Sequence, residues 1–235
     1  MRTSLFCLLG LATAVSVSAA DSKADLEKAI KDLAGKANYS WKTTVTVPES
    51  SGNRFRMGPT EGQAEKDGLV HVSMTMGENK IEMAIQGKKA AVLGQDGTWQ
   101  AAEELSNAEG PGRFAGMMAR NFKAPAGQAG ELVGFAKELK QDGDAYTGDL
   151  TEDGVKQLLS FRRGAGAEAP AVANPKGNAK LWVKDGTLSK YEFHVEGTVT
   201  FNGNDIQMNR TTTVEIKDVG TTKVQVPEEA KKKLS

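Results

Sequence analysis

Apolar and polar residues alternate along two long blocks of the chain. In WKTTVTV (41–47), LVHVSMTM (69–76) and KIEMAIQ (80–86), every second residue is apolar or a threonine. This period of two is typical of strands in an antiparallel sheet that is covered on one face only. The positions predicted to share the covered face are Trp41, Thr43, Val45, Val47, Val70, Val72, Met74, Met76, Ile81, Met83 and Ile85.

Short turns that contain glycine separate these strands. Asp67 with Gly68, Gly77, Gly87, and Asp96 with Gly97 fit tight hairpins. They predict a meander over residues 41–100, in which strands that follow one another in sequence are neighbours in the sheet. Its last hairpin is expected in KKAAVLGQDGTWQ (88–100).

Helical periodicity replaces the alternation near the start of the chain and in its middle. SKADLEKAIKDLAG (22–35) predicts an amphipathic helix, with Ser22 as N-cap and Gly35 at its end. Three short helices are expected within 113–122, 130–139 and 152–161. A short strand around Tyr146 precedes the last of them, which Thr151 can cap. The buried positions expected in these helices are Leu26, Ala29, Ile30, Leu33, Phe114, Met117, Met118, Phe122, Leu132, Phe135, Ala136, Leu139, Val155, Leu158 and Leu159.

Alternation returns in the last quarter of the chain. Residues 179–186, 187–203 and 204–218 predict three strands, with Tyr191, Phe193 and Val195 on the covered face. The segment from Arg162 to Gly177 that precedes them is rich in Ala, Gly and Pro. It predicts a mobile surface loop.

The stretch TTTVEIKDVGTTKVQVPEEA (211–230) closes this second block. It predicts the last long strand, a hinge over 218–222, and a short edge strand in which Val224 and Val226 face inward. Pro227 would then end the pairing at that edge of the sheet. The following Lys231, Lys232 and Lys233 are expected to form a frayed, solvated tail.

The first twenty residues, MRTSLFCLLGLATAVSVSAA, have a basic start, an apolar run and small residues at their end. This pattern predicts a secretory signal peptide at 1–20, so the mature chain would begin at Ala20 or Asp21. The chain's single cysteine, Cys7, lies inside this leader. An exported domain of about 215 residues without disulfides must be stabilised by its core, which favours the periplasm and a single domain over 21–235.

The composition gives no sign of nucleic-acid binding. The chain has 30 Lys plus Arg and 30 Asp plus Glu residues, and therefore no net charge. A balanced charge does not favour a polyanionic partner or an anionic membrane surface.

The order of the expected elements resembles the LolA-like superfamily, which includes periplasmic lipoprotein carriers, the sensor domain of RseB-type regulators, and LprG and LppX type lipid carriers. The residues that carry the resemblance are AKLWVKDGTLSKYEFHVEG (179–197) and VEIKDVGTTKVQVP (214–227). The resemblance implies a mainly β fold with an α insert: a curved antiparallel sheet, or open half-barrel, whose concave face is covered by short helices. The Phe-Arg-Trp triplet of lipoprotein carriers has no match, since the nearest similar residues are Phe55, Arg56 and Met57, earlier in the chain.

Known catalytic and metal-binding patterns are not found. His71 and His194 both fall on the polar side of their strands, without a second histidine or a cysteine at metal-ligand spacing. There is no Gly-x-Ser-x-Gly turn, and the glycines of GPGRFAG (110–116) lack a phosphate-binding lysine. We expect neither enzymatic activity nor a metal or cofactor.

Two functions fit these observations. The first is the binding of a hydrophobic ligand, such as a lipid or its acyl chains, between the sheet and a helical lid formed by residues 103–164. The second is a periplasmic sensing or scaffolding module with a solid interior that binds a periplasmic or membrane partner protein. Flexible methionines can line a lipid cavity or simply fill a core. The residues expected to line a ligand site are Trp41, Val45, Val72, Met74, Met76, Met83, Phe114, Met118, Leu132, Phe135, Phe193 and Val195.

Overall fold

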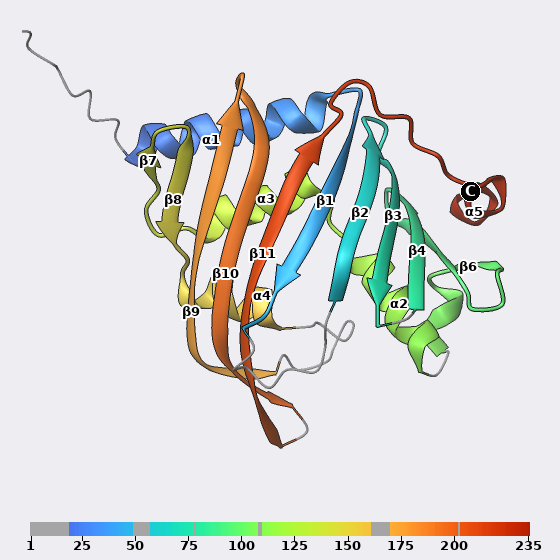
Figure 1. Ribbon diagram of the computed structural model, residues 1–235. Helices are drawn as coiled ribbons and strands as arrows, with labels where there is room; N and C mark the ends of the chain where they lie inside the picture. The colour runs from blue at the N-terminus through green and yellow to red at the C-terminus, as the bar shows by residue number, and fades with distance from the viewer. Residues whose placement is uncertain (1–18, 49–56, 78, 108–109, 161–169, 202) are drawn as a thin grey trace, which may run out of the picture.

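A single curved antiparallel sheet forms the body of the protein. The computed structural model describes residues 19–48, 57–77, 79–107, 110–160, 170–201 and 203–235. Within them, eleven strands form one sheet in the order β6-β5-β4-β3-β2-β1-β11-β10-β9-β8-β7. Figure 1 shows α1, α2, α3 and α4 together behind the sheet, which curves around them and is not closed into a barrel. The expected fold class, a mainly β open sheet covered by short helices, is confirmed.

The first block of strands forms the predicted meander. Each strand from β1 to β6 pairs with the next one in the sequence, and short turns join β2 to β3, β3 to β4 and β4 to β5. Val70, Val72, Met74 and Met83 are buried on the inner face, as the alternation predicted. The strands are β1 (Asn38–Thr46), β2 (Met57–Glu65), β3 (Leu69–Met76), β4 (Asn79–Gln86), β5 (Lys89–Leu93) and β6 (Trp99–Ala101).

Strand β2 is the one member of the meander that the sequence did not predict. Its sequence, MGPTEGQAE, has few apolar side chains, and it is held by pairing with β1 and β3 on either side. Gly62 lies opposite Trp41 in the register. A Cβ atom at Gly62 would stand 2.0 Å from the Trp41 ring, so the glycine makes the room in which the large ring lies.

Helices cover the inner face. α1 (Ala19–Gly35) buries Leu26, Ala29, Ile30 and Leu33, as predicted, and packs against α3 and β10. The central segment provides η2 (Glu104–Asn107), α2 (Pro111–Asn121), α3 (Pro125–Phe135) and α4 (Glu152–Leu159). Together with the inner face of the sheet, these helices enclose the main core.

Two of the central helices differ from the prediction. α2 buries the small residues Ala115, Gly116 and Ala119, and leaves Phe114, Met117 and Met118 half-buried. α3 begins at Pro125 and ends at Phe135. Leu139 is therefore buried from the connection that follows α3 and not from the helix.

The connection from α3 to α4 adds two strands to the far edge of the sheet. These are β7 (Lys140–Asp142) and β8 (Ala145–Asp149), and β8 pairs with β9. The strand expected around Tyr146 is thus confirmed. Thr151 caps α4, as predicted: its hydroxyl accepts a hydrogen bond of 3.2 Å from the backbone N–H of Gly154.

The long second block consists of β9 (Ala171–Lys184), β10 (Thr187–Phe201) and β11 (Asn204–Lys217). The expected loop over 162–177 is wrong in its second half, because residues 171–177 belong to β9. The glycine- and proline-rich sequence is accommodated by a bulge, in which Asn174 has a positive φ of 51° and the register shifts opposite Gly197. Residues 161–169 lie outside the described residues.

The C-terminus corrects a second prediction. Residues 223–227 run extended over the outer face without joining the sheet, and the three lysines belong to a helix, α5 (Glu228–Leu234). Val226, Ala230 and Leu234 are buried against Ala84, Ala91 and Trp99, which point to the outer face of β4, β5 and β6. Val226, Ala230 and Leu234 follow one another at intervals of four residues, so α5 and the segment before it bury one apolar side, and the expected edge strand and frayed tail are wrong.

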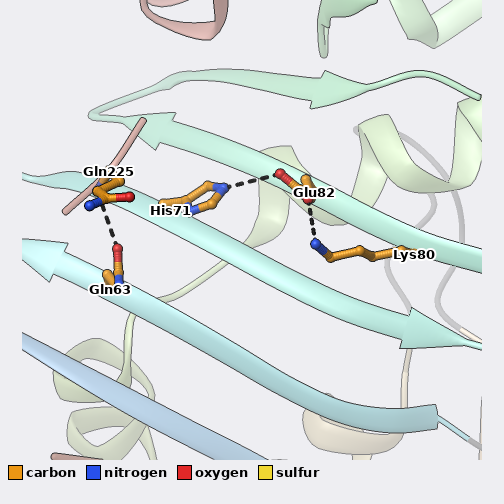
Figure 2. A network of polar contacts seen from close by, with 5 residues as sticks. All are labelled: Gln63, His71, Lys80, Glu82 and Gln225. Carbon is orange, nitrogen blue, oxygen red and sulfur yellow. Dashed lines mark hydrogen bonds and ion pairs between the residues drawn. The ribbon is translucent and has the colours of Figure 1, made fainter. Parts of the chain in front are cut away.

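The C-terminal segment also borders a polar network on the outer face (Figure 2). The backbone N–H of Gln225 donates to Gln63 at 3.2 Å. Beside them, His71 lies 3.5 Å from Glu82, and Lys80 lies 2.7 Å from the same carboxylate. The lysine hydrogen bond, with the nearby positive charge, holds the pKa of Glu82 below its usual value.

Candidate functional site

The centre of the molecule contains a cavity of about 620 Å³ between the inner face of the sheet and the helices. Trp41, Met74 and Tyr191, which line it from the sheet, are buried. Asn121, Lys123 and Gln157, which line it from the helical side, are exposed to solvent. The cavity therefore extends from the sheet to the surface between the helices.

The floor of the cavity is formed by five neighbouring strands. Thr60 of β2 lies opposite both Thr43 of β1 and Met74 of β3 in the register. On the other side of β1, β11 and β10 bring further residues to the same face. The residues that line the floor are Trp41, Thr43, Thr60, Met74, Tyr191 and Thr212.

The roof is formed by the three central helices. α2 ends over the cavity, α3 runs along it, and the last turn of α4 closes one side. The residues that line the roof are Met117, Met118, Asn121, Phe122, Lys123, Pro125, Gln128, Glu131, Phe135, Gln157, Leu158 and Ser160.

Two contacts join the floor to the roof. The ring of Trp41 stacks on Phe122, with centroids 6.1 Å apart and planes inclined by 26°. The Tyr191 hydroxyl donates a hydrogen bond of 2.7 Å to the side-chain oxygen of Gln128 on α3. Burial raises the pKa of Tyr191 well above its ordinary value, so this hydroxyl stays protonated and remains a donor.

The position of α4 is stabilised by a half-buried cation, Arg210, which contacts the cavity-lining residue Leu158. The Arg210 guanidinium donates a hydrogen bond of 2.8 Å to the carbonyl oxygen of Leu158, in the last turn of the helix. A cation at the C-terminal end of a helix is favoured by the helix dipole. Burial lowers the pKa of Arg210, by removing water from its charge.

At the mouth of the cavity, the charges balance. Lys123 and Glu131 form an ion pair between the α2–α3 connection and α3. No other charged residue lines the cavity in the part of the chain that the structure describes. The lining thus combines aromatic and methionine side chains with uncharged hydroxyl and amide groups.

The structure brings together only some of the residues predicted for a ligand site. Trp41, Met74, Met118 and Phe135 line the cavity. Val45 and Phe114 are half-buried outside the lining, and nothing is described for the side chain of Met76, which lies in β3. The remaining predicted residues, Val72, Met83, Leu132, Phe193 and Val195, are buried in the core around the cavity.

The methionines, too, are divided between the cavity lining and the core. Met74, Met117 and Met118 line the cavity, whereas Met83 is fully buried and Met208 packs against the core. Some of the methionines expected in the interior therefore line the cavity, and others fill the core. The alternation placed Met74 and Met83 on the inner face, but it could not show where the helices leave space.

Sequence reasoning missed most of the polar lining. Thr60 lies in a strand without alternation, and Thr212 lies in the run TTT, where the two faces look alike. Gln128 lies before the helix expected within 130–139, and Gln157 lies in the helix expected within 152–161 but not among its predicted buried positions. The sequence indicated one polar residue of the lining, Thr43, because the alternation places it on the same face as Trp41.

Metal-binding clusters are not found in the described residues. No group of three His, Cys, Asp or Glu side chains there could hold a metal ion. His194 lies outside the cavity lining, and its Nε2 atom is 3.0 Å from Asn209. None of the described helices has the length and apolar character needed to cross a membrane.

Comparisons with known proteins give structural similarities only. No protein-family model and no curated protein sequence matches the chain. Among solved structures, it is similar to the Mycobacterium tuberculosis lipoprotein LppX, with a TM-score of 0.46 and 13% identity over 88% of this chain and 98% of that one. It is also similar to LprF from Mycobacterium bovis, with a TM-score of 0.47 and 11% identity over 91% and 99% of the two chains.

A third similar structure is a LolA superfamily protein from Nitrosomonas europaea, with a TM-score of 0.35 and 9% identity over 89% of this chain and 96% of that one. LppX and LolA are also names of the group that the sequence resembles. Because all three TM-scores lie below 0.5, the function proposed below rests on the geometry of this chain.

Proposed function

We propose that this protein binds a hydrophobic ligand, most simply the acyl chains of a lipid, in the cavity between the sheet and the central helices. The observation that carries the proposal is the cavity itself, about 620 Å³ in volume and lined by Trp41, Met74, Met118, Phe122 and Phe135. Pockets for small molecules commonly measure about 300–1,000 Å³ and have largely apolar walls.

The physical basis of binding is the burial of apolar surface. Removing it from water stabilises a complex by roughly 25 cal/mol per Å². Methionine side chains adapt to chains of different shape, because they are unbranched and polarizable. The ligand would be bound and released without covalent chemistry, which agrees with the absence of catalytic motifs in the sequence.

The alternative, a module with a solid interior that binds a partner protein, has less support. Among the described residues, the large hydrophobic side chains classed as exposed are Ile206 and Val219, which lie on different segments. They do not form the contiguous apolar patch that such an interface needs.

The ligand can be tested directly. Lipid should be extractable from the protein purified from its native compartment, and native mass spectrometry should show the corresponding mass. In a Thr43→Trp variant, the new ring would fill part of the cavity, and the bound lipid should be lost. Thr44→Trp is the matched control, because Thr44 is exposed on the opposite face of the same strand. A bare polypeptide in the unmodified protein would contradict the proposal.

We also propose that the chain is exported and acts in the periplasm, on the strength of the leader-like residues 1–20. Residues 1–18 lie outside the described residues. The N-terminus of the protein isolated from a periplasmic extract should be Ala20 or Asp21, and an intact N-terminus at Met1 would argue against export.

A further inference from the structure

Three threonine side chains lie at the centre of the cavity floor. Thr43 on β1 lies directly opposite Thr60 on β2, and Thr212 on β11 lies opposite Val45, two positions along β1 from Thr43. All three threonines line the cavity, and Thr60 and Thr212 are less than a tenth exposed. A group of three hydroxyls thus spans three adjacent strands, with Met74 on one side and Tyr191 on the other.

Hydroxyls in this place are unfavourable for a purely apolar ligand. A buried polar group that loses its hydrogen bond to water and gains no other partner costs free energy. An acyl chain lying across Thr43, Thr60 and Thr212 would displace water from them without replacing its hydrogen bonds. A ligand with its own polar atoms at this level would instead satisfy them.

The charged residues of the lining indicate whether the polar atoms of the ligand carry a charge. Its two charged residues, Lys123 and Glu131, neutralise each other. Arg210 is outside the lining, and its guanidinium is engaged with the carbonyl of Leu158. A phosphate or an ammonium group placed against the threonines would lose its hydration without gaining an opposite charge from the described lining, and this loss is costly.

Amide groups on the roof add uncharged donors and acceptors. Gln128 accepts the hydrogen bond from Tyr191 on the floor, and Asn121 and Gln157 line the cavity nearer to solvent. Such groups suit ester, ether and hydroxyl oxygens, each of which exchanges hydrogen bonds with neutral partners. The apolar residues between them suit the attached chain.

We propose that the ligand is a neutral amphiphile, an acyl ester of an uncharged polyol or sugar, whose ester and hydroxyl oxygens lie against Thr43, Thr60 and Thr212. This inference rests on the proposed function and adds the chemical class of the ligand. The three threonines act as a specificity determinant, and the apolar residues of the cavity supply the general affinity.

The test uses a neutral and an anionic lipid with the same chain. The delipidated protein is loaded with the uncharged fluorophore N-phenylnaphthylamine, which is then displaced by monopalmitoylglycerol or by palmitoyl lysophosphatidylglycerol. We expect monopalmitoylglycerol to bind at least about tenfold more tightly, since tenfold corresponds to roughly 1.4 kcal/mol, the value of one or two hydrogen bonds.

A triple variant, Thr43→Val with Thr60→Val and Thr212→Val, removes the hydroxyls and keeps the branched shape of the side chains. Its affinity for monopalmitoylglycerol should fall about tenfold, and its affinity for N-phenylnaphthylamine should not fall. Thr44→Val, on the exposed face of β1, is the control and should bind both as before.

The outcomes separate the two proposals. If N-phenylnaphthylamine and both lipids fail to bind the folded protein, the proposed function itself is wrong. If the anionic lipid binds as tightly as the neutral one, or the triple variant keeps the preference, lipid binding stands and the neutral class is overturned.

Discussion

The helices pack closely against the sheet at its β4–β6 end, whereas a cavity separates them from the sheet at its centre. At the β4–β6 end, α2 packs on the inner face and α5 packs on the outer face, so both sides are covered. Small residues, Ala84 and Ala91, allow this close approach on the outer side. At the centre, the ends of α2 and α4 and the length of α3 surround a cavity. One sheet thus provides a packed support at its β4–β6 end and a cavity over its central strands, because the two regions differ in how closely the helices approach the sheet.

The strongest test of this difference is a truncation in the packed end. Trp99→Ala would leave a void between β6 and α5, since Trp99 is buried there with Leu234 and Val226. We expect a loss of about 3–5 kcal/mol in the free energy of unfolding, measured by urea denaturation.

Trp182→Ala is the matched control for this tryptophan. Trp182 is half-buried on the outer face, where Lys190 lies 4.8 Å from the centre of its ring. Its removal should cost about 1 kcal/mol. Equal losses for the two variants would show that the β4–β6 end is not the more tightly packed region.

A second test compares a methionine in the packed core with one in the cavity lining. Met83 is fully buried in the core, whereas Met74 lines the cavity. Met83→Ala should therefore destabilise the protein by about 2–5 kcal/mol, and Met74→Ala by less than about 2 kcal/mol, because fewer contacts are lost beside an existing space. Ligand affinity should change in the opposite order, with the larger loss in Met74→Ala. Displacement of N-phenylnaphthylamine measures the ligand affinity. A larger loss of affinity in Met83→Ala than in Met74→Ala would contradict the assignment of the site.

Removing the hydrogen bond between the floor and the roof should have a smaller effect on stability. Tyr191→Phe removes the donor to Gln128 and should cost about 1 kcal/mol of stability. If the roof moves to release the ligand, N-phenylnaphthylamine should dissociate about fivefold faster, as expected for an interaction of that size. Tyr146→Phe, in β8 and outside the cavity lining, is the control in stopped-flow measurements. An unchanged rate in Tyr191→Phe would mean that release does not break this contact.

The smallest effect is expected in the polar network beside the packed end (Figure 2). The pKa of Glu82 is lowered in the folded protein, so its carboxylate contributes stability at neutral pH that is lost as the pH falls through the folded pKa. Glu82→Gln should cost less than about 1 kcal/mol at neutral pH.

This cost should disappear in acid, below the pKa of Glu82 in the folded protein, because both proteins then lack the charge. Urea denaturation at a series of pH values measures the difference in stability between the unmodified protein and Glu82→Gln. A difference that persists at the acid end would show that Glu82 acts through packing and not through its charge.

Much of the fold could be predicted from local patterns. The inward phases of β1, β3 and β4, the buried face of α1 and the cap at Thr151 follow from the spacing of apolar residues and from turn chemistry. The prediction failed where another part of the chain decides the structure. β2 is a strand because it pairs with β1 and β3, and residues 171–177 are a strand because they pair with β10 across a bulge.

The candidate site shows the same limit. Of the predicted site residues whose side chains the structure describes, only Trp41, Met74, Met118 and Phe135 line the cavity. Whether an inward residue meets a helix or an open space depends on where that helix lies. Its position is set by contacts such as Arg210 with Leu158 and Tyr191 with Gln128, between residues far apart in sequence.

The sequence by itself determined which side of each alternating strand is apolar, where the hairpins turn and that helices must cover the sheet. These properties depend on neighbours within a few residues, and the burial of apolar side chains enforces them. Only the tertiary structure decided that α5 covers Ala84 and Ala91 on the outer face. It also brought Thr43, Thr60 and Thr212 together on one floor, because residues on different strands become neighbours only through the register of the folded sheet.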